Sequence, residues 1–338
     1  MLNVYDALPV GLLQCEAREL AQLLPGPSLI HLPGEQAQPL FVSVLLHGNE
    51  TSGWDAVRSI LQDYQNRPLP RALSLFIGNV AAASQGVRHL PDQPDYNRIW
   101  KAQGQHQEEV MVRQVLEIMR EREVFACIDV HNNTGRNPHY ACINRLAAPF
   151  FDLATSFSKT VVYFLQPDSV LSMAFASLCP AVTIECGQPG EGHGVDEARE
   201  FIVNILHRAG LAEEGNEVGH VDVFHTVAIV KLNTGVRVGP LQEGDHFELH
   251  PQLDQHNFHL MPVGTRFGQV LRDGPFPVQV TNEFGRDVAE RYFALEDDEL
   301  VTRVEVMPSM LTLDREVIQQ DCLCYLMEKL DLAKPLSA

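Results

Sequence analysis

The sequence predicts an α/β protein with a mostly parallel sheet and helices on both faces, followed by a smaller C-terminal β domain. Short apolar runs alternate with segments of helical spacing up to about residue 208, and this alternation is typical of a parallel sheet covered on both faces. After about residue 221 the pattern changes to short β-like runs interrupted by Gly, Pro and Asp, which predicts a separate β domain. We therefore expect one domain over residues 1–215 and a second over residues 216–338.

The predicted elements of the first domain are short runs of apolar and β-branched residues for strands, and apolar residues three and four positions apart for helices. The expected strands are 28–32, 39–46, 73–79, 125–130, 140–143, 160–164 and 181–186, and the expected helices are 54–64, 108–122 and 195–208. Between them, residues 80–105 form a long irregular segment, and segments of this kind usually carry function. In the second domain, Asp314 is predicted to cap a closing helix that ends near Leu330.

Composition and charge narrow the class of protein. The chain has 44 acidic and 25 basic side chains and a net charge of −19, so neither nucleic acid nor an anionic membrane is an expected partner. The first 20 residues lack a basic lead followed by a long apolar run, so we expect no signal peptide. No stretch approaches the roughly 20 apolar residues that cross a bilayer. With an odd count of seven cysteines, these features indicate structural thiols and a cytoplasmic location.

An imidazole and a carboxylate follow the predicted strand 39–46. His47 comes directly after it, Glu50 follows three residues later, and His131 stands at the end of strand 125–130. Open α/β sheets place their sites at the carboxyl ends of strands. Two histidines and a glutamate form the zinc-binding set of thermolysin and carboxypeptidase A, which leaves a fourth position for water. The alternative is that the two histidines merely cap their strands.

Other polar side chains accompany these three. Asp129 and Asn132 are candidates for holding the outer nitrogen of an imidazole. Glu185 lies in the apolar strand 181–186, where an unpaired carboxylate is costly, so it is either a general base beside the metal or part of a buried ion pair.

The irregular segment adds two guanidinium groups and an amide. Arg88, Asn97 and Arg98 bring them into an otherwise acidic protein. A guanidinium binds a carboxylate in bidentate fashion and stabilises a developing oxyanion. The alternative is that each arginine is a solvated surface charge.

Four motifs in this order carry a resemblance to a known family. They are HGNETSG at 47–53, the Asn97–Arg98 pair, DVHN at 129–132 and TIECG at 183–187. Together they resemble the succinylglutamate desuccinylase/aspartoacylase family, a branch of the zinc-carboxypeptidase superfold. The resemblance spans most of the chain, because LHPQLDQHNFHLMPVGTRF is similar to the aspartoacylase carboxyl-terminal β domain.

The resemblance implies a role for each site residue. It implies one Zn²⁺ per chain, bound by His47, Glu50 and His131. It further implies that Arg88 polarises the scissile carbonyl, that Asn97 and Arg98 hold the α-carboxylate of the substrate, and that Glu185 is the base.

The sequence departs from aspartoacylases in the substrate region. Aspartoacylases carry an arginine about ten residues before the catalytic glutamate, whereas this chain has Ala174 or Phe175 there and no arginine between Arg145 and Arg199. Acetylaspartate is therefore not the expected substrate. TIECG is similar to the desuccinylase version of the strand, while DVHNNTGRN is closer to the aspartoacylase version. Candidate contacts to the rest of the substrate follow the third ligand, namely Asn133, Arg136, His139 and Tyr140, and His193 is expected to be a loop side chain.

The hypothesis that combines these features is a zinc-dependent hydrolase. It would deacylate a small N-acylated amino acid by cleaving an amide or ester bond, and by resemblance the β domain would cover the site and exclude larger substrates. One alternative is a metallocarboxypeptidase that uses the same residues on short peptides. The other is a non-catalytic zinc-binding protein, which has no need of a base or an oxyanion group.

Overall fold

The chain divides into two compact units. The computed structural model describes residues 1–213 and 221–332. The first unit comprises Met1–Asn132 and His139–Asp222, and the second comprises Asn133–Pro138 and Val223–Ala338. The predicted boundary between residues 215 and 216 lies outside the described residues. A short segment of the amino-terminal half, Asn133–Pro138, thus belongs to the second unit, which the sequence did not indicate.

The first unit is built on a mixed sheet with the strand order β1-β2-β4-β3-β5-β8-β6-β7. Its strands are β1 (Asn3–Tyr5), β2 (Ser28–Leu32), β3 (Gly34–Val44), β4 (Leu69–Ile77), β5 (Ala126–His131), β6 (Tyr140–Ile143), β7 (Thr160–Tyr163) and β8 (Ala181–Glu185). Of the neighbouring pairs along this order, β2–β4 and β6–β8 are antiparallel and the others are parallel. The predicted, mostly parallel sheet is therefore confirmed.

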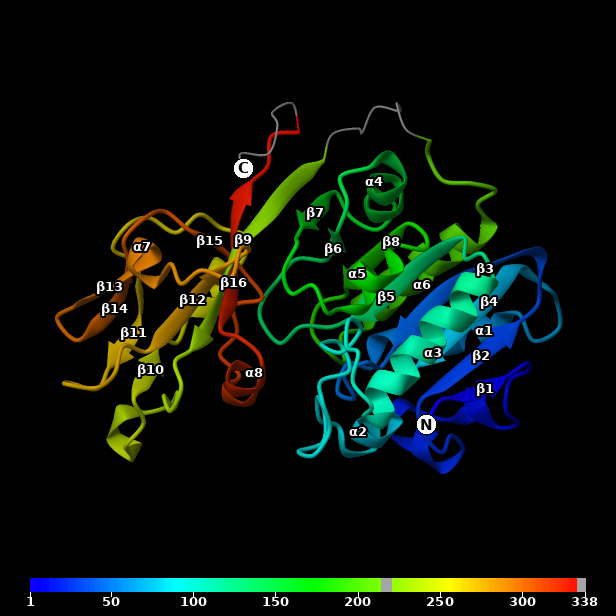
Figure 1. Ribbon diagram of the computed structural model, residues 1–338, viewed down its shortest axis with the longest axis horizontal. Coiled ribbons are helices and arrows are strands. Elements are labelled where there is room, and N and C mark those ends of the chain that lie inside the picture. The colour runs from blue at the N-terminus through cyan, green and yellow to red at the C-terminus, as the bar shows by residue number, and fades with distance from the viewer. Residues whose placement is uncertain (214–220, 333–338) are drawn as a thin grey trace. The chain divides into compact units, whose positions relative to one another are not determined.

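Helices cover both faces of this sheet. They are α1 (Ser52–Asp63), α2 (Val80–Gln85), α3 (Gln107–Glu121), α4 (Ala148–Thr155), α5 (Leu171–Phe175) and α6 (Gly192–His207), and Figure 1 shows α3 across the front of the sheet. A Cβ atom on Gly53 would lie 3.0 Å from Val44 Cγ1, so α1 packs closely on that face. Phe41 of the same strand stacks on Phe175 of α5, with ring centroids 4.2 Å apart. Because side chains alternate along a strand, α1 and α5 lie on opposite faces.

The segment 80–105 is not wholly irregular, as the sequence had suggested, because it begins with α2. The Asn79 side chain accepts a hydrogen bond from the Ala82 N–H and caps this helix. The helix ends at Gly86, whose φ of 68° lies in the left-handed region that glycine favours. Alanine-rich residues between a cap and a terminating glycine are enough to form this short helix.

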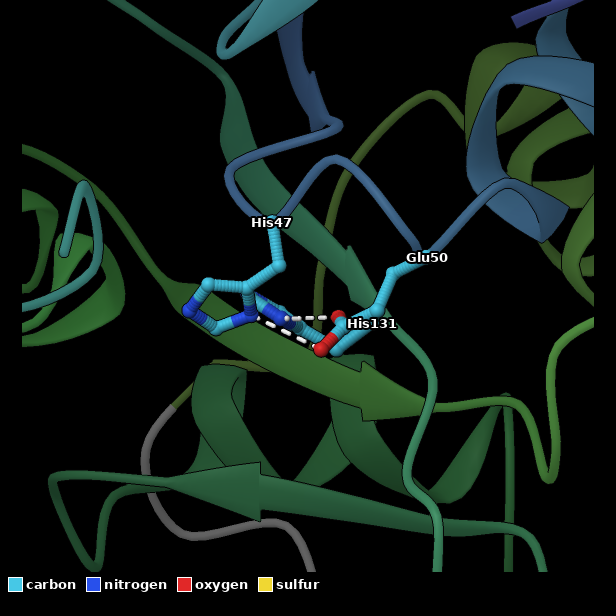
Figure 2. Close-up of side chains that lie close together, drawn as sticks. All are labelled: His47, Glu50 and His131. Atoms are coloured by element: carbon cyan, nitrogen blue, oxygen red, sulfur yellow. Dashed lines mark hydrogen bonds and ion pairs between the residues drawn. The ribbon is translucent and has the colours of Figure 1, made fainter. Parts of the chain in front are cut away.

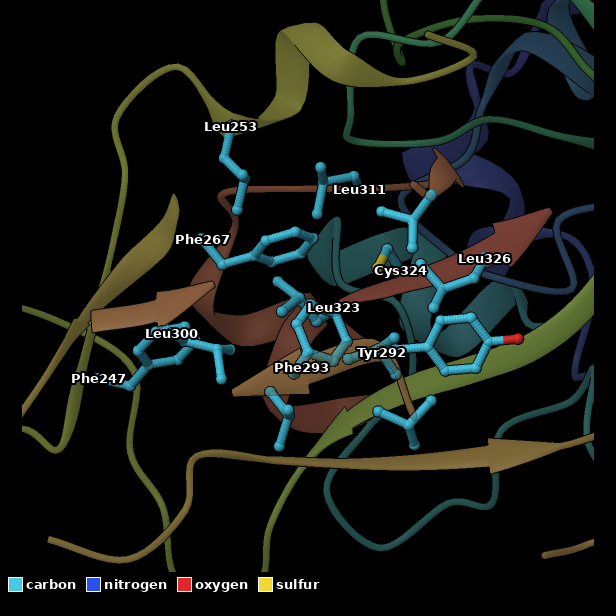
Figure 3. Close-up of a cluster of buried hydrophobic side chains, with 14 of the residues drawn as sticks. Phe247, Leu253, Phe267, Tyr292, Phe293, Leu300, Leu311, Leu323, Cys324 and Leu326 are labelled. Atoms are coloured by element: carbon cyan, nitrogen blue, oxygen red, sulfur yellow. The ribbon is translucent and has the colours of Figure 1, made fainter. Parts of the chain in front are cut away.

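The second unit is a smaller, antiparallel β structure. Its strands are β9 (Asp222–Leu232), β10 (Phe247–Leu249), β11 (Arg266–Val270), β12 (Val278–Asn282), β13 (Phe293–Glu296), β14 (Glu299–Thr302), β15 (Met307–Ser309) and β16 (Cys324–Lys329). One sheet has the order β10-β11-β14-β13, while β16 pairs with β15 and with β9, and β12 pairs with β9. Figure 3 shows the core of this unit, where Phe267 and Phe293 meet edge to face at 4.9 Å.

The predicted closing helix to Leu330 is wrong. Asp314 does cap a helix, because its side chain accepts hydrogen bonds from two backbone N–H groups, but this helix, α8 (Arg315–Gln320), is short. The chain then enters β16, which pairs antiparallel with β9 and β15. Residues 322–327 are all buried, and a buried run without a polar face satisfies its backbone better between two strands than in a surface helix.

Helices long and apolar enough to span a bilayer are absent from residues 1–213 and 221–332.

His31 makes the stability of the first unit depend on pH. The side chain is buried in β2, and its Nδ1 lies 2.9 Å from Ser74 Oγ. Burial, together with the charge of Arg122, lowers the pKa of His31 from 6.5 to about 4. Below pH 6.5 the unfolded chain therefore binds a proton that the folded chain does not, so stability falls as the pH drops towards 4. We expect His31 to cost on the order of 1–2 kcal/mol of unfolding free energy at pH 5 relative to pH 7.5.

Urea unfolding at the two pH values measures this cost. The His31→Gln variant should be less sensitive to the pH change than the unmodified chain by that amount. An equal change in both proteins would contradict the assignment.

Candidate active site

Three buried side chains from the carboxyl-terminal edge of the sheet converge. His47 follows β3, Glu50 precedes α1, and His131 ends β5. His47 Nδ1 lies 2.8 Å from Glu50 Oε1, and His131 Nδ1 lies 2.8 Å from Glu50 Oε2, as Figure 2 shows. The one ligand atom that each residue offers lies within 4.8 Å of the other two. The structure thus brings together the three residues that the sequence proposed as metal ligands.

A tight turn after β3 places the first two of these residues. Leu45 has a φ of 56°, so the chain leaves the strand in a left-handed conformation. At Gly48 a Cβ atom would lie 2.2 Å from the Ala83 nitrogen of α2, so only glycine fits there. The Gly48 N–H donates to the Arg88 carbonyl, and the Glu50 N–H donates to the His47 carbonyl. This turn aims both side chains at the end of β5.

Carboxylates hold the outer nitrogen of each imidazole. His47 Nε2 lies 3.0 Å from Asp95 Oδ1, and His131 Nε2 lies 2.9 Å from Asp129 Oδ2. Histidines that bind a metal through one nitrogen usually present the other to such a partner, which fixes the ring orientation. Both Nδ1 atoms are therefore turned towards Glu50. The donor set of two nitrogens and one carboxylate, with both rings held from outside, fits a divalent cation.

Only one of the two predicted outer partners has that role. Asp129 contacts the His131 ring, as the sequence suggested, but Asn132 does not. The Asn132 side chain instead accepts from the Ser52 N–H and donates to the Gly187 carbonyl, while its backbone N–H donates to Glu50 Oε2. Through these hydrogen bonds Asn132 positions the Glu50 carboxylate and the loop after β8.

The charges at this site are strongly coupled. Burial lowers the pKa of His131, but the carboxylates of Asp129 and Glu50 raise it by more than burial lowers it. The pKa of His131 therefore lies well above its usual range. For Glu50, burial opposes the effect of the two histidines, which hold the pKa of its carboxyl below the usual range. Without a metal, the rings therefore tend to keep protons between themselves and Glu50. A divalent cation at the same point would displace those protons.

The irregular segment contributes a residue that the sequence analysis missed. Asp95 joins His47 to Arg88, since its Oδ2 accepts from Arg88 Nε at 3.1 Å and Nη2 at 2.8 Å. Arg88 Nη1 also lies 3.8 Å from Glu50 Oε1. Asp95 stands two residues before Asn97 in the same motif, so a search for a carboxylate partner of the first histidine there could have found it.

Asn97 and Arg98 lie beside this network. Asn97 is buried; its Nδ2 lies 3.3 Å from His131 Nε2, and its Oδ1 accepts from the Leu171 N–H. Arg98 Nη1 donates to the Asn97 carbonyl at 3.0 Å. Burial raises the pKa of Asp95, but His47, Arg88 and, to a smaller extent, Arg98 lower it well below its usual range. Asn97 thus contacts the proposed metal ligand His131. Arg98 interacts electrostatically with Asp95, the carboxylate that holds the ring of His47.

Glu185 lies next to His131 in the sheet. It is the last residue of β8 and the pairing partner of His131 in the parallel β5–β8 pair. Residues paired in this way point to the same face of the sheet from strands about 5 Å apart. Glu185 is 4% exposed. The pairing places this carboxylate on the side of the sheet where the three proposed ligands meet.

Arg136 belongs to the second unit. Its exposed guanidinium Nε lies 3.4 Å from Asp254 Oδ2. This ion pair gives Arg136 a surface role within that unit.

A model of the succinylglutamate desuccinylase/aspartoacylase catalytic domain matches residues 36–205, which is half of the chain and includes every site residue described above. The chain belongs to the succinylglutamate desuccinylase/aspartoacylase family. A search of curated proteins by sequence finds no match.

Solved structures agree with the fold of this desuccinylase/aspartoacylase family member. Succinylglutamate desuccinylase from Chromobacterium violaceum is 17% identical, with a TM-score of 0.60 over 90% of this chain and 89% of that one. A succinylglutamate desuccinylase/aspartoacylase from Rhodobacter sphaeroides is 15% identical, with a TM-score of 0.59 over 89% and 88%. Murine aminoacylase 3 is 15% identical, with a TM-score of 0.55 over 88% and 96%. These similarities confirm the predicted fold class.

Proposed function

We propose that the chain is a zinc-dependent hydrolase that deacylates a small N-acylated amino acid. Membership of the desuccinylase/aspartoacylase family supports a hydrolase of this substrate class. The observation that carries the proposal is the convergence of His47 Nδ1, His131 Nδ1 and the Glu50 carboxylate, with Glu185 paired to His131. A structural zinc site is closed by four protein ligands, whereas three ligands beside an acid and a guanidinium suit catalysis.

His47, Glu50 and His131 would hold one zinc ion per chain. When bound, zinc supplies Lewis acidity, which lowers the pKa of water and polarises a carbonyl. Asp95 and Asp129 keep the two rings oriented from outside. Glu185 accepts the proton of the attacking water and delivers it to the leaving nitrogen, which is the work of a general base that becomes an acid.

Arg88, Asn97 and Arg98 would act on the substrate. Arg88 donates hydrogen bonds to the oxyanion that develops on the scissile carbonyl, and Asp95 holds its guanidinium in place. Asn97 and Arg98 bind the free carboxylate of the amino acid and thereby orient the amide bond. Ala174 or Phe175 stands at the place where aspartoacylases carry an arginine, and Phe175 is fully buried against Phe41. The proposal therefore excludes a second carboxylate contact there, and acetylaspartate should be a poor substrate.

Hydrolysis of a panel of N-acyl amino acids by the zinc-loaded protein tests this function. The panel includes succinyl, acetyl and benzoyl derivatives, each with a matched dipeptide, and release of free amine is measured. We expect turnover of at least one N-acyl amino acid. Turnover of dipeptides alone would favour a metallocarboxypeptidase, and no turnover by a zinc-loaded protein would favour a non-catalytic zinc-binding protein.

The proposal also includes where the protein acts and on what. We place it in the cytoplasm, in keeping with seven free cysteines of which six are buried. Its partner is a small-molecule substrate, with neither nucleic acid nor membrane, as the net charge of −19 suggests.

Arg98→Ala is expected to raise KM rather than lower kcat. Removing a charge-assisted hydrogen bond costs about 1.5–3 kcal/mol, so KM for an N-acyl amino acid should rise about 10–100-fold. The matched substrate is the corresponding N-acyl amino acid amide, which lacks the carboxylate. Its KM should differ little between Arg98→Ala and the unmodified chain. An equal rise in KM for both substrates would show that Arg98 does not bind the substrate carboxylate.

Asp129→Asn is expected to weaken zinc binding while leaving the fold intact. The carboxylate faces His131 Nε2 from a fully buried position, and loss of such an outer partner lowers metal affinity about 10–100-fold. Competition with a zinc-binding dye measures the change. Asp55→Asn in α1 serves as the control, because Asp55 pairs with Arg58 away from the site. Unchanged affinity in the Asp129 variant would remove Asp129 from the metal centre.

A further inference from the structure

A second cluster of histidines and a carboxylate lies in the first unit. Glu197 Oε2 contacts His139 Nδ1, and Glu197 Oε1 lies 2.9 Å from His193 Nε2. The two imidazole rings stack, with centroids 5.1 Å apart. As in the first cluster, three ligand atoms lie within 4.8 Å of one another. The proposed hydrolysis uses none of these residues.

Two ordered elements hold the cluster. His193 and Glu197 are four residues apart in α6, so they share one face of the helix on successive turns. His139 directly precedes β6; its carbonyl accepts from Ser158 Oγ at 2.9 Å, and its ring stacks on Phe157. An i,i+4 pair on a helix and a third side chain directly before a strand therefore form a three-point donor set on ordered elements.

The chemistry and exposure of these donors suit an ion from solution. Imidazole nitrogens with one carboxylate favour zinc, nickel, cobalt or copper, whereas magnesium and calcium favour oxygen ligands. The side chain of His193 is 75% exposed, that of Glu197 35% and that of His139 17%. An ion can therefore reach the cluster directly, and water can fill its remaining coordination positions.

We propose that His139, His193 and Glu197 bind a second divalent transition-metal ion, distinct from the one at His47, Glu50 and His131. This site would brace the loop that follows Glu185. At Gly187, where φ is 72°, a Cβ atom would lie 2.8 Å from His139 Nε2, so the loop backbone passes directly against this ring. Asn132 Nδ2 donates to the carbonyl of the same glycine. An ion joining α6 to His139 thus fixes the near end of the loop.

Counting Zn²⁺ ions bound to the chelator-treated, full-length chain tests the proposal. Equilibrium dialysis against Zn²⁺ followed by elemental analysis should give two ions per chain in the unmodified protein and one in His193→Ala. His207→Ala is the matched control, because His207 lies at the other end of α6, with its Nε2 3.1 Å from the Tyr64 hydroxyl; it should keep two. A single ion that is bound equally by the unmodified chain and by His193→Ala, or two ions in His193→Ala, would overturn the proposal.

Variants of the first site separate this proposal from the proposed function. His47→Ala should still bind one Zn²⁺, and added Zn²⁺ should raise its melting temperature. In the double variant His47→Ala, His193→Ala, Zn²⁺ should neither bind nor shift the melting temperature. Retention of the ion and of the shift in this double variant would also overturn the second site, whatever the catalytic activity of the unmodified chain.

Discussion

Glu185→Gln is expected to lower kcat for an N-acyl amino acid by about 10²–10⁴-fold, the usual contribution of a general base. The amide keeps the shape of the carboxylate but accepts no proton from water. Glu185 ends a buried strand and pairs with His131, so a substitution of equal size should leave the strand and the metal ligands in place. The measurement is kcat per zinc-loaded chain, with zinc content determined on the same samples.

The control for this variant is a neighbouring carboxylate. Glu191 lies six residues after Glu185, in the loop before α6, and its carboxylate accepts a hydrogen bond from the Gln188 N–H. The kcat of Glu191→Gln should stay near that of the unmodified chain. If Glu185 were instead only part of a buried ion pair, Glu185→Gln would unfold at a lower temperature and keep its kcat. Full kcat in zinc-loaded Glu185→Gln would end its role as the base.

Glu50→Ala is expected to abolish zinc binding at the first site and with it the activity. The two Glu50 oxygens face both Nδ1 atoms, and one of them also accepts from the Asn132 N–H. Without this carboxylate, two imidazoles with raised pKa values lose the negative charge between them. Removal of one partner from such a buried charged group costs about 3–5 kcal/mol, so the unfolding free energy should fall as well.

Zinc titration and unfolding of the same variant measure both effects. The matched comparison is Asp55→Asn, which removes a carboxylate that pairs with Arg58 in α1, away from both clusters, and should leave activity and stability near those of the unmodified chain. If Glu50→Ala were as active as the unmodified chain, Glu50 would not be a zinc ligand.

Much of the sheet could be predicted because its central strands are buried on both faces. Runs such as Phe41–Val44 have no polar periodicity and few alternatives to a central strand. The same burial makes a polar residue at a strand end conspicuous, which is why His47, His131 and Glu185 stood out. Their meeting follows from parallel pairing, since the carboxyl ends of β3, β5 and β8 lie at one edge.

The features that the sequence missed depend on contacts distant in the chain. Asp95 becomes part of the site only because the segment after α2 folds back onto His47, 48 residues earlier. Residues 324–329 form a strand rather than a helix because β9 and β15 are available on either side. The Asn132 amide could hydrogen-bond the outer nitrogen of an imidazole, but in the structure it contacts Ser52 and Gly187 instead. Periodicity describes one segment at a time and does not indicate such partners.

A crystal structure of the zinc-loaded protein, with anomalous diffraction recorded at the zinc edge, is the most direct test of the catalytic centre. We expect an anomalous peak that places a zinc ion within bonding distance of His47 Nδ1, His131 Nδ1 and the Glu50 carboxylate. The Glu185 carboxylate should face the open coordination position of this ion. A zinc-loaded crystal without a peak between these three side chains, or with Glu185 turned away from it, would contradict the proposed enzyme.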